Sequence, residues 1–225
     1  MKIGIIAALD CEMEEFCRDF GAVDSGHYGI FSGKCKEHDV YICLAGVGKV
    51  NAAANTQRLI DLFGVDYVIN SGVAGCTCNH LGVCDVVISK ELTYHDFSPL
   101  DILDKYAPNA SVFKANEKLV KLANDACAKI EDENFRYDTG MIVTGDIFVE
   151  DSTLVKKFRD NFGALCTEME GAAVAHVCLL NKVPFVVIRA MSDNADEKAD
   201  MSFNEMAAIA AKRAGFVSTY IISNL

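Results

Sequence analysis

Short apolar runs alternate with amphipathic segments along the whole chain, and this alternation constrains the fold more than any other feature. The apolar runs, such as 2–8 and 185–190, are continuous, as in strands that are covered on both faces. Between them, segments such as 116–130 carry apolar residues at helical spacing. The pattern predicts an α/β fold of three layers, in which helices flank a central mixed, mostly parallel β-sheet. We expect one domain over residues 1–225, because no linker or repeat interrupts the pattern.

The same pattern predicts where each element lies. Strands are expected at the apolar runs 2–8, 28–33, 40–45, 67–70, 83–89, 140–144, 164–167 and 185–190. Helices are expected at the amphipathic segments 10–20, 51–63, 116–130, 153–161, 171–180 and 203–223. The stretch 95–109 holds two of the three prolines and is predicted to be a long surface loop.

The formal net charge of −11 limits what the chain can bind. A field of this sign repels phosphate backbones and anionic lipid, so we expect no binding to nucleic acid or membrane. No apolar run reaches the ~18 residues that a membrane span needs. The opening run turns acidic at Asp10, too early for a signal peptide. We therefore expect a cytoplasmic protein whose ten cysteines are reduced thiols.

Four soft metal ligands lie close together in the segment that contains Cys76, Cys78, His80 and Cys84. Their spacing differs from the paired Cys-x2-Cys pattern of structural zinc sites, and the segment opens on a glycine turn. Thiols that are packed or exposed to solvent are the favoured interpretation. Zinc binding is the minor alternative.

Carboxylates stand inside apolar sequence at two places. Glu168 and Glu170 lie one residue apart between apolar runs, and Asp193 follows the predicted strand 185–190. Acids in such surroundings are paired, hydrogen-bonded or catalytic. Burial raises the pKa of a carboxyl group, which suits a proton donor near neutral pH. Glu12, by contrast, is on its own most simply a solvated acid at a helix start.

Three glycine-bearing segments resemble nucleotide-binding loops only superficially. The run 3–9 lacks the Gly-x-Gly-x-x-Gly turn, which argues against dinucleotide binding. The segment 45–50 fails as a Walker loop, because Cys43 replaces a glycine and Val50 replaces Ser or Thr. It is better explained as a turn that opens the next helix. The segment 70–75 ends a predicted strand and is either a plain turn or part of a ligand site.

Seven segments form one pattern when they are taken in order. They are 2–8 with Glu12, 45–53, 70–75, 94–96, 145–148, 168–172 and 183–193. The pattern resembles the 5'-methylthioadenosine/S-adenosylhomocysteine nucleosidases of the nucleoside phosphorylase superfamily over nearly the whole chain. Its most specific parts are Glu-Met-Glu-Gly-Ala and Val-Pro-Phe-Val-Val-Ile-Arg-Ala-Met-Ser-Asp in the last two segments.

The resemblance implies hydrolysis of the N-glycosidic bond of 5'-methylthioadenosine and S-adenosylhomocysteine, through a transition state with oxocarbenium character. Asp193 would protonate N7 of the adenine, and Ser192 would orient Asp193. Glu12 would hold and deprotonate the attacking water, with Arg189 nearby. Glu170 would accept hydrogen bonds from the ribose hydroxyls and help to stabilise the developing cation.

The resemblance also implies a set of substrate contacts. Met169 would pack on the sugar, Phe148 would stack on the adenine, and the backbone of Val149 would pair with the adenine edge. Phe203 would line the pocket for the 5' substituent. Glu168 lies beside the sugar in this scheme but has no chemical step.

Two departures from the family pattern bear on the substrate. The turn formed by Val73, Ala74 and Gly75 should bring backbone atoms against the ligand. At the position of Val73, the family usually has Ser. The segment 97–106 is also unlike the family, in which this loop covers the 5' end of the substrate in a neighbouring subunit. The natural 5' group therefore stays open. We expect a homodimer from the family, with an adenine nucleoside and water as reactants and with no cofactor or metal.

Three alternatives remain. A purine nucleoside phosphorylase must bind phosphate with cations. The turn after the first strand instead carries four acids, Asp10, Glu12, Glu14 and Glu15, which would repel phosphate and favour water as the nucleophile. A related hydrolase for futalosine-type or 5'-deoxyadenosine substrates would differ only in the 5' pocket. A nucleoside-binding protein without turnover would not need an acid and a base together.

Overall fold

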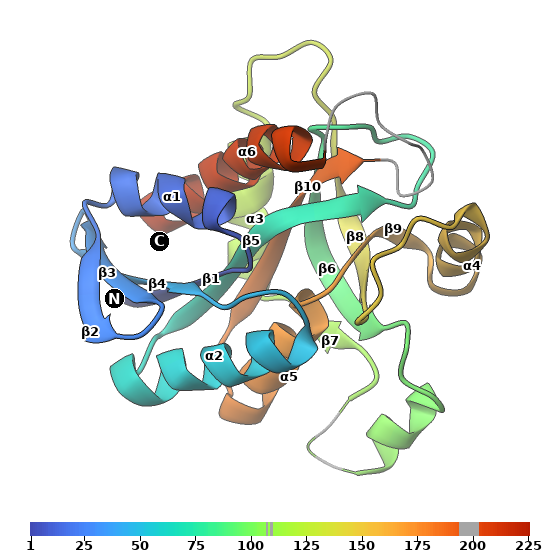
Figure 1. Ribbon diagram of the computed structural model, residues 1–225, viewed down its shortest axis with the longest axis horizontal. Helices are drawn as coiled ribbons and strands as arrows, with labels where there is room; N and C mark the ends of the chain where they lie inside the picture. The colour runs from blue at the N-terminus through green and yellow to red at the C-terminus, as the bar shows by residue number, and fades with distance from the viewer. Residues whose placement is uncertain (107, 109, 194–202) are drawn as a thin grey trace.

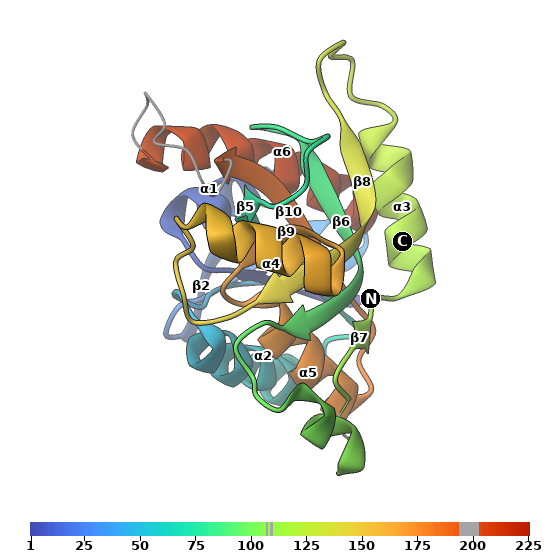
Figure 2. The same cartoon turned by 90° about the vertical axis from the view of Figure 1, so that its right-hand side faces the viewer.

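A single mixed β-sheet runs through the molecule, with helices against both of its faces (Figures 1 and 2). The computed structural model describes residues 1–106, 108, 110–193 and 203–225, with the side chains of the last helix described from residue 205 onward. The layered arrangement confirms the α/β fold that the sequence predicts. Within the described ranges, no helix combines the length and the apolar character that crossing a membrane requires.

The elements follow one another in the alternating order that the sequence suggests. The strands are β1 (Lys2–Ala7), β2 (Val23–His27), β3 (Ile30–Cys35), β4 (His38–Leu44), β5 (Tyr67–Cys76), β6 (Val86–Tyr94), β7 (Phe113–Lys114), β8 (Tyr137–Thr144), β9 (Ala164–Glu168) and β10 (Phe185–Asp193). The helices are α1 (Asp10–Asp19), α2 (Lys49–Phe63), α3 (Glu117–Cys127), α4 (Ser152–Phe162), α5 (Gly171–Asn181) and α6 (Phe203–Ser223), with a 3-10 helix, η1, at Leu100–Lys105.

The sheet has the strand order β10-β6-β8-β9-β5-β1-β4-β3-β2, and β10 also pairs with β5. This extra pairing makes one half of the sheet close on itself. Parallel pairings join β4, β1, β5 and β10, and also β6, β8 and β9. Antiparallel pairings join the two groups and build the outer hairpin. The carboxyl ends of β1, β5 and β10 therefore lie at one edge of the sheet.

Strand β1 shows why the apolar runs are continuous. Ile3 and Ile5 pack in the core on the side of α1, α3 and α6, whereas Ile6 packs on the side of α2 and α5. All three side chains are fully buried. A Cβ atom at Gly4 would lie 3.2 Å from Leu59 Cδ1 of α2, so a longer side chain there would require Leu59 to shift. Figure 1 shows these two helical layers on opposite faces, and Figure 2 shows α4 in front of β9.

The prediction of a turn at 70–75 is wrong. Strand β5 does not end at Asn70 but continues to Cys76, because β10 pairs with it from Val68 to Gly75 and β9 pairs with its last two residues. Periodicity could not show this, since the pairing partners are remote in the sequence. Gly72 allows close packing of side chains against the strand.

Other differences are smaller and concern exposed elements, short elements or the bounds of a strand. The strand predicted at 28–33 is the second strand of a hairpin, whose first strand, β2, is exposed and carries no apolar pattern. Strand β6 begins later and ends later than the predicted strand 83–89. The two-residue strand β7 was not predicted, and the predicted loop at 95–109 contains η1. The exposed strand β2 and the two-residue strand β7 leave no clear apolar period in the sequence, whereas β6 is buried and differs from the prediction only in its bounds.

Candidate active site

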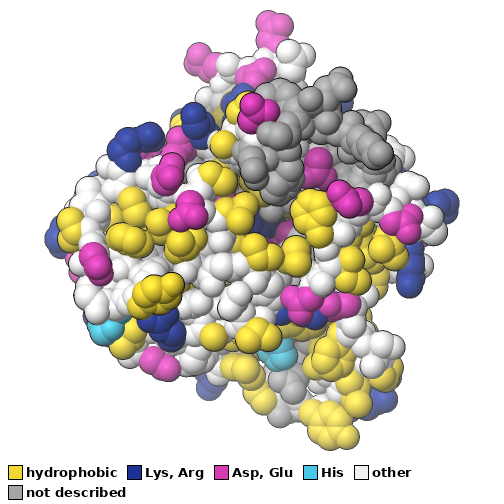
Figure 3. All heavy atoms as spheres, in the orientation of Figure 1, with side chains coloured by type: hydrophobic (Ala, Val, Ile, Leu, Met, Phe, Trp, Pro, Cys, Tyr) yellow, Lys and Arg dark blue, Asp and Glu magenta, His cyan; other side chains and the backbone are white. Residues whose placement is uncertain are grey.

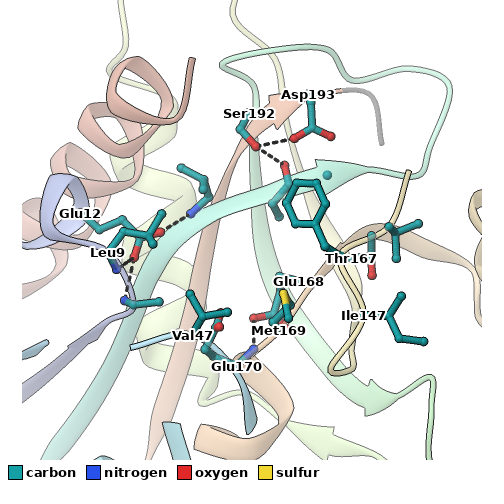
Figure 4. A pocket seen from close by; sticks show the side chains of 16 residues that line it. Leu9, Glu12, Val47, Ile147, Thr167, Glu168, Met169, Glu170, Ser192 and Asp193 are labelled. Atoms are coloured by element: carbon teal, nitrogen blue, oxygen red, sulfur yellow. Dashed lines mark hydrogen bonds between the residues drawn. The ribbon is translucent and has the colours of Figure 1, made fainter. Parts of the chain in front are cut away.

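A cavity of about 200 Å³ opens at the carboxyl ends of β1, β5 and β10, where ligands commonly bind in open α/β sheets. Its lining residues are Ala8, Leu9, Glu12, Val47, Val73, Ala74, Gly75, Ile147, Phe148, Val149, Thr167, Glu168, Met169, Glu170, Ser192 and Asp193. Figure 4 shows Glu12 on one side of the cavity, Ser192 and Asp193 on a second side, and Glu168, Met169 and Glu170 on a third.

The structure brings together almost all of the predicted site residues. Arg189, which was predicted to lie near Glu12, is fully buried behind the cavity. Phe203 begins α6, and because its side chain lies outside the described residues, its place in the 5' pocket stays a prediction. Sequence reasoning missed five lining residues: Ala8, Leu9, Val47, Ile147 and Thr167. Most of them lie within a few positions of a predicted residue, so adjacency in the sequence was the available signal.

Glu12 is held by the start of helix α1. Its Oε2 accepts hydrogen bonds from the amides of Ala8 at 2.7 Å and Leu9 at 3.0 Å, and its Oε1 accepts one from Val73 at 2.9 Å. The side chain is buried, so the interpretation of a solvated acid is wrong. Burial raises the pKa of Glu12, against the opposing effect of Arg189 and the backbone amides. The site thus holds a fixed, weakly acidic carboxyl group.

Arg189 supplies the positive charge behind the cavity. It lies in β10 with no exposed surface, and its Nη2 donates to Asn70 Oδ1 at 2.8 Å, to Glu168 and to Glu170 Oε2 at 3.4 Å. Its Nε and Nη1 have no hydrogen-bond partner in the described part of the chain. A buried cation needs such carboxylate partners, because desolvation alone would strongly disfavour the charge.

Gly72 makes room for this charged group within β5. A Cβ atom at this position would lie 2.1 Å from Arg189 Nη1 and 2.5 Å from Glu12 Oε1. Both distances are too short for any real contact. The glycine is therefore required for close approach of charged side chains to the strand, and not for a turn.

Glu168 ties the site to helix α5. Its Oε2 accepts hydrogen bonds from the amides of Glu170 at 2.9 Å and Gly171 at 2.6 Å, at the positive end of the helix. Its Oε1 accepts one from the hydroxyl of Thr144, which in turn accepts from the amide of Ala172 at 2.8 Å. These bonds, together with Arg189, occupy both carboxylate oxygens. Glu168 is thus equipped to orient the start of α5.

Glu170 precedes α5 and points into the cavity. Its Oε1 accepts a hydrogen bond from the amide of Gly48 at 2.8 Å. Burial raises the pKa of Glu170 to about 7, with a contribution from the nearby Glu168, while Arg189 acts in the opposite direction. The raised pKa therefore follows chiefly from burial, and the neighbouring carboxyl groups of Glu168 and Glu12 add to it.

Asp193 ends β10 at the far side of the cavity from Glu12 (Figure 4). The hydroxyl of Ser192 donates to Asp193 Oδ2 at 2.7 Å and lies 3.4 Å from the carbonyl oxygen of Ala74. Ser192 is buried, whereas Asp193 is only partly buried. The hydroxyl therefore sets the orientation of a carboxyl group that faces the cavity.

The remaining walls are apolar. Leu9, Val47, Ile147 and Phe148 line the cavity, and the last three also reach the surface. Figure 3 shows hydrophobic side chains spread around the hollow on this face of the molecule. Such walls suit a flat, mostly apolar ligand with a few polar groups.

An ionic cluster joins three segments near the mouth of the cavity. Lys49 Nζ lies 2.7 and 2.6 Å from the two carboxylate oxygens of Asp96 and 3.6 Å from Asp146 Oδ2. The amide of Lys49 donates to Asp146 Oδ1 at 2.9 Å, and the amide of Asp146 donates to Asp96 Oδ2 at 2.9 Å. The cluster connects the glycine turn before α2 to the loop that carries Phe148.

The cysteine segment lies close to the cavity but is not arranged as a metal site. Among the described residues, no three His, Cys, Asp or Glu side chains are grouped to hold a metal ion. His80 instead pairs with Asp138 at 2.8 Å, and Cys76 and Cys78 contact each other. All ten cysteines are free thiols.

Carboxyl groups on opposite sides of a cavity of this size define an enzyme site suited to cleaving a glycosidic bond. The chain matches the model of the phosphorylase superfamily over residues 2–223. A 5'-methylthioadenosine/S-adenosylhomocysteine nucleosidase from Geobacillus sp. (strain WCH70) is 38% identical over 232 residues, covering 100% of this chain and 99% of the relative. The chain belongs to the phosphorylase superfamily and, within it, to the 5'-methylthioadenosine/S-adenosylhomocysteine nucleosidases. The family predicted from the sequence is thus confirmed.

Solved structures agree with this placement. The crystal structure of a nucleosidase of the same name from Colwellia psychrerythraea, in complex with adenine, is 36% identical with a TM-score of 0.91, covering 100% of this chain and 96% of the other. The futalosine hydrolase of Helicobacter pylori is 30% identical with a TM-score of 0.88, covering 100% and 98%. The fold is therefore shared by enzymes whose names indicate different substrates.

Proposed function

We propose that this protein hydrolyses the N-glycosidic bond of 5'-methylthioadenosine and S-adenosylhomocysteine, releasing adenine and a 5'-thio-substituted ribose. The observation that carries the proposal is that Glu12, Glu170 and Asp193, far apart in the sequence, line one cavity. The name of the Geobacillus relative and the adenine bound in the Colwellia structure support the substrate class.

In this proposal, residues at the two ends of the cavity perform different steps of the reaction. Asp193, oriented by Ser192, protonates N7 of the adenine, so that the base leaves as a neutral molecule. Glu12 holds and deprotonates the attacking water on the opposite face of the sugar. Glu170 accepts hydrogen bonds from the ribose hydroxyls, and its carboxylate, when charged, favours the growing positive charge on the sugar. Arg189 keeps the carboxyl groups in place from behind the cavity.

The apolar walls would hold the rest of the nucleoside. Phe148 stacks on the adenine, the backbone of Val149 pairs with the adenine edge, and Met169 packs on the sugar. Val73 to Gly75 place backbone against the ligand. Phe203 is proposed to line the 5' pocket, on the sequence pattern alone. Turnover of a panel of adenine nucleosides with different 5' groups, including futalosine-type and 5'-deoxyadenosine substrates, would define the natural substrate.

Water, and not phosphate, is the proposed nucleophile. Four carboxyl groups line the cavity, and Arg189 is already engaged by two of them, so an incoming phosphate would be repelled. The decisive experiment measures adenine release from 5'-methylthioadenosine with and without phosphate in the buffer. We expect equal rates and free 5-methylthioribose as the product. A strict requirement for phosphate would instead identify a phosphorylase.

We also propose that the enzyme acts as a homodimer in the cytoplasm. Exposed apolar residues near the cavity, such as Val50, Ile147 and Phe148, support a partner subunit over this face. The ten free thiols support a reducing compartment. The molar mass in solution, measured by light scattering, tests the dimer. A monomer at all protein concentrations would exclude it.

A further inference from the structure

Two thiols that the proposed reaction does not use lie in contact at the end of β5. The Sγ atoms of Cys76 and Cys78 are 3.7 Å apart. A disulfide bond has an S–S distance of about 2.05 Å, so closing the pair needs a shift of only about 1.7 Å. Cys76 is buried and Cys78 is partly exposed. The geometry thus offers one accessible sulfur and one sheltered sulfur within reach of each other.

The surroundings give the two sulfurs different roles. Cys76 Sγ lies 3.5 Å from each of two carbonyl oxygens, those of Cys78 and Leu81. These oxygens can accept a hydrogen bond from the protonated thiol, but they would repel a thiolate. The pKa of Cys76 is raised, first by its hydrogen bond to Cys78 and then by burial. The pKa of Cys78 is lowered to about 6 by the same hydrogen bond, with help from the backbone amides of His80 and Leu81. Cys78 is the more exposed sulfur of the pair and has the lower pKa, so it is assigned as the nucleophile.

One basic side chain near the pair favours the same assignment. His80 lowers the pKa of Cys78, although it also pairs with Asp138. The Arg159 guanidinium group lies near the pair and donates to the carbonyl oxygen of Thr77 at 3.4 Å and to Asn79 Oδ1 at 2.5 Å.

Other cysteines lack these features. The three other partly buried thiols, Cys11, Cys17 and Cys84, all have a pKa that burial raises. The fully buried Cys166 lies opposite Cys76 in the pairing of β5 with β9, and its pKa is raised as well. The contact with Cys76 and the stabilised negative charge therefore distinguish Cys78 from each of these thiols.

We propose that Cys76 and Cys78 form a reversible dithiol–disulfide site that reacts with small disulfides. The Cys78 thiolate attacks one sulfur of the small disulfide, which forms a mixed disulfide and releases one thiolate. Cys76 then loses its proton and attacks Cys78 Sγ, which forms the Cys76–Cys78 bond and releases the second small thiol. The two protein thiols are oxidised, and the small disulfide is reduced to two thiols. This site does not depend on the function proposed above.

Oxidised glutathione is a suitable probe. The reduced full-length protein is incubated with it, free thiols are then alkylated, and the tryptic peptide 59–90 is analysed by tandem mass spectrometry, which separates Cys84 from the pair. We expect a peptide that is alkylated only at Cys84 and is lighter by two hydrogen atoms than the same peptide with Cys76 and Cys78 as free thiols. The bond should join Cys76 and Cys78, and no glutathione should be retained. Dithiothreitol should restore two alkylatable thiols.

Variants separate the two steps. Cys76→Ser should stop the reaction at a stable glutathione adduct on Cys78, and Cys78→Ser should prevent both the adduct and the disulfide. Cys84→Ser, a matched change at another partly buried thiol, should leave the reaction unchanged. Circular dichroism establishes that each variant is folded. Two alkylatable thiols at 76 and 78 after oxidation of the wild type, or faster modification of Cys84 than of Cys78, would overturn the proposal.

Discussion

The amide of Gly48 donates a hydrogen bond of 2.8 Å to Glu170 Oε1, across 122 positions of sequence. Gly48 immediately precedes α2, and Glu170 immediately precedes α5. The positive end of α2 therefore faces the carboxyl group of Glu170. This contact fixes the group at the position where our proposal requires an acceptor for the ribose hydroxyls.

Replacing Glu170 by Gln tests this role. The amide can still accept from Gly48, but it cannot offer a negative charge to the developing cation. We expect kcat/KM for 5'-methylthioadenosine to fall on the order of 100-fold, as when one preorganised electrostatic group is removed. The melting temperature should change little, because the shape of the side chain is kept. Near-normal activity would contradict the assignment of Glu170.

The raised pKa of Glu170 predicts a pH-dependent stability. Its ordinary pKa is 4.5, and burial raises it to about 7 in the folded protein. Between these values the folded state binds more protons than the unfolded state, so the contribution to stability is present below 4.5 and is lost as the pH rises to about 7. Urea unfolding at a series of pH values should show this decline in the wild type. The decline should be smaller in Glu170→Gln, and an equal decline would rule out Glu170 as its source.

Asp193→Asn should separate binding from chemistry. The side chain keeps its shape and can still accept from Ser192, but it can no longer deliver a proton to the adenine. We expect kcat to fall by about 10²–10⁴, the usual contribution of a general acid, with little change in substrate affinity by calorimetry. Ser192→Ala should have a smaller effect, about tenfold, because only the hydrogen bond that orients Asp193 is lost. A fully active Asn variant would remove Asp193 from its role.

Gly72→Ala should disrupt the charged group behind the cavity. The added methyl would lie 2.1 Å from Arg189 Nη1, so the guanidinium group or the strand must move. Overpacking of this kind costs about 1–3 kcal/mol in the free energy of unfolding, and displacement of Arg189 and Glu12 should also lower activity. Gly82→Ala is the matched control, because nothing lies within 4 Å of a Cβ atom there. Equal stability of the two variants would show that Gly72 is not required.

Asp96→Asn should loosen the mouth of the cavity. It removes the charge that holds Lys49, in an ion pair whose side chains are only 23% and 18% exposed. Losing a hydrogen bond to a charged group costs about 1.5–3 kcal/mol, so we expect KM to rise by about an order of magnitude with a smaller change in kcat.

Asp160→Asn is the control for this change, since it breaks a more exposed pair with Lys156 and should leave KM unchanged. If both variants keep the wild-type KM, the ionic cluster has no part in positioning the loop that carries Phe148.

The end of strand β5 could not be predicted from the sequence. The apolar run 67–70 predicts the start of the strand, but the continuation to Cys76 depends on pairing with β10 and β9. Likewise, Gly72 looks like a turn residue in the sequence, whereas its function is to admit Arg189 and Glu12. Local propensity is a weak guide wherever remote partners supply the hydrogen bonds and the packing.

The sequence by itself determined the alternating α/β pattern and the family, and it led to the proposal that Glu12, Glu170 and Asp193 are the catalytic acids, because periodicity and motif order are properties of the chain. Only the tertiary structure decided that Glu12 is buried, that Glu168 orients α5 and that Gly48 binds Glu170. The physical reason is that pKa values and hydrogen-bond partners depend on which groups meet in space, and the closing of β10 onto β5 brings these groups together.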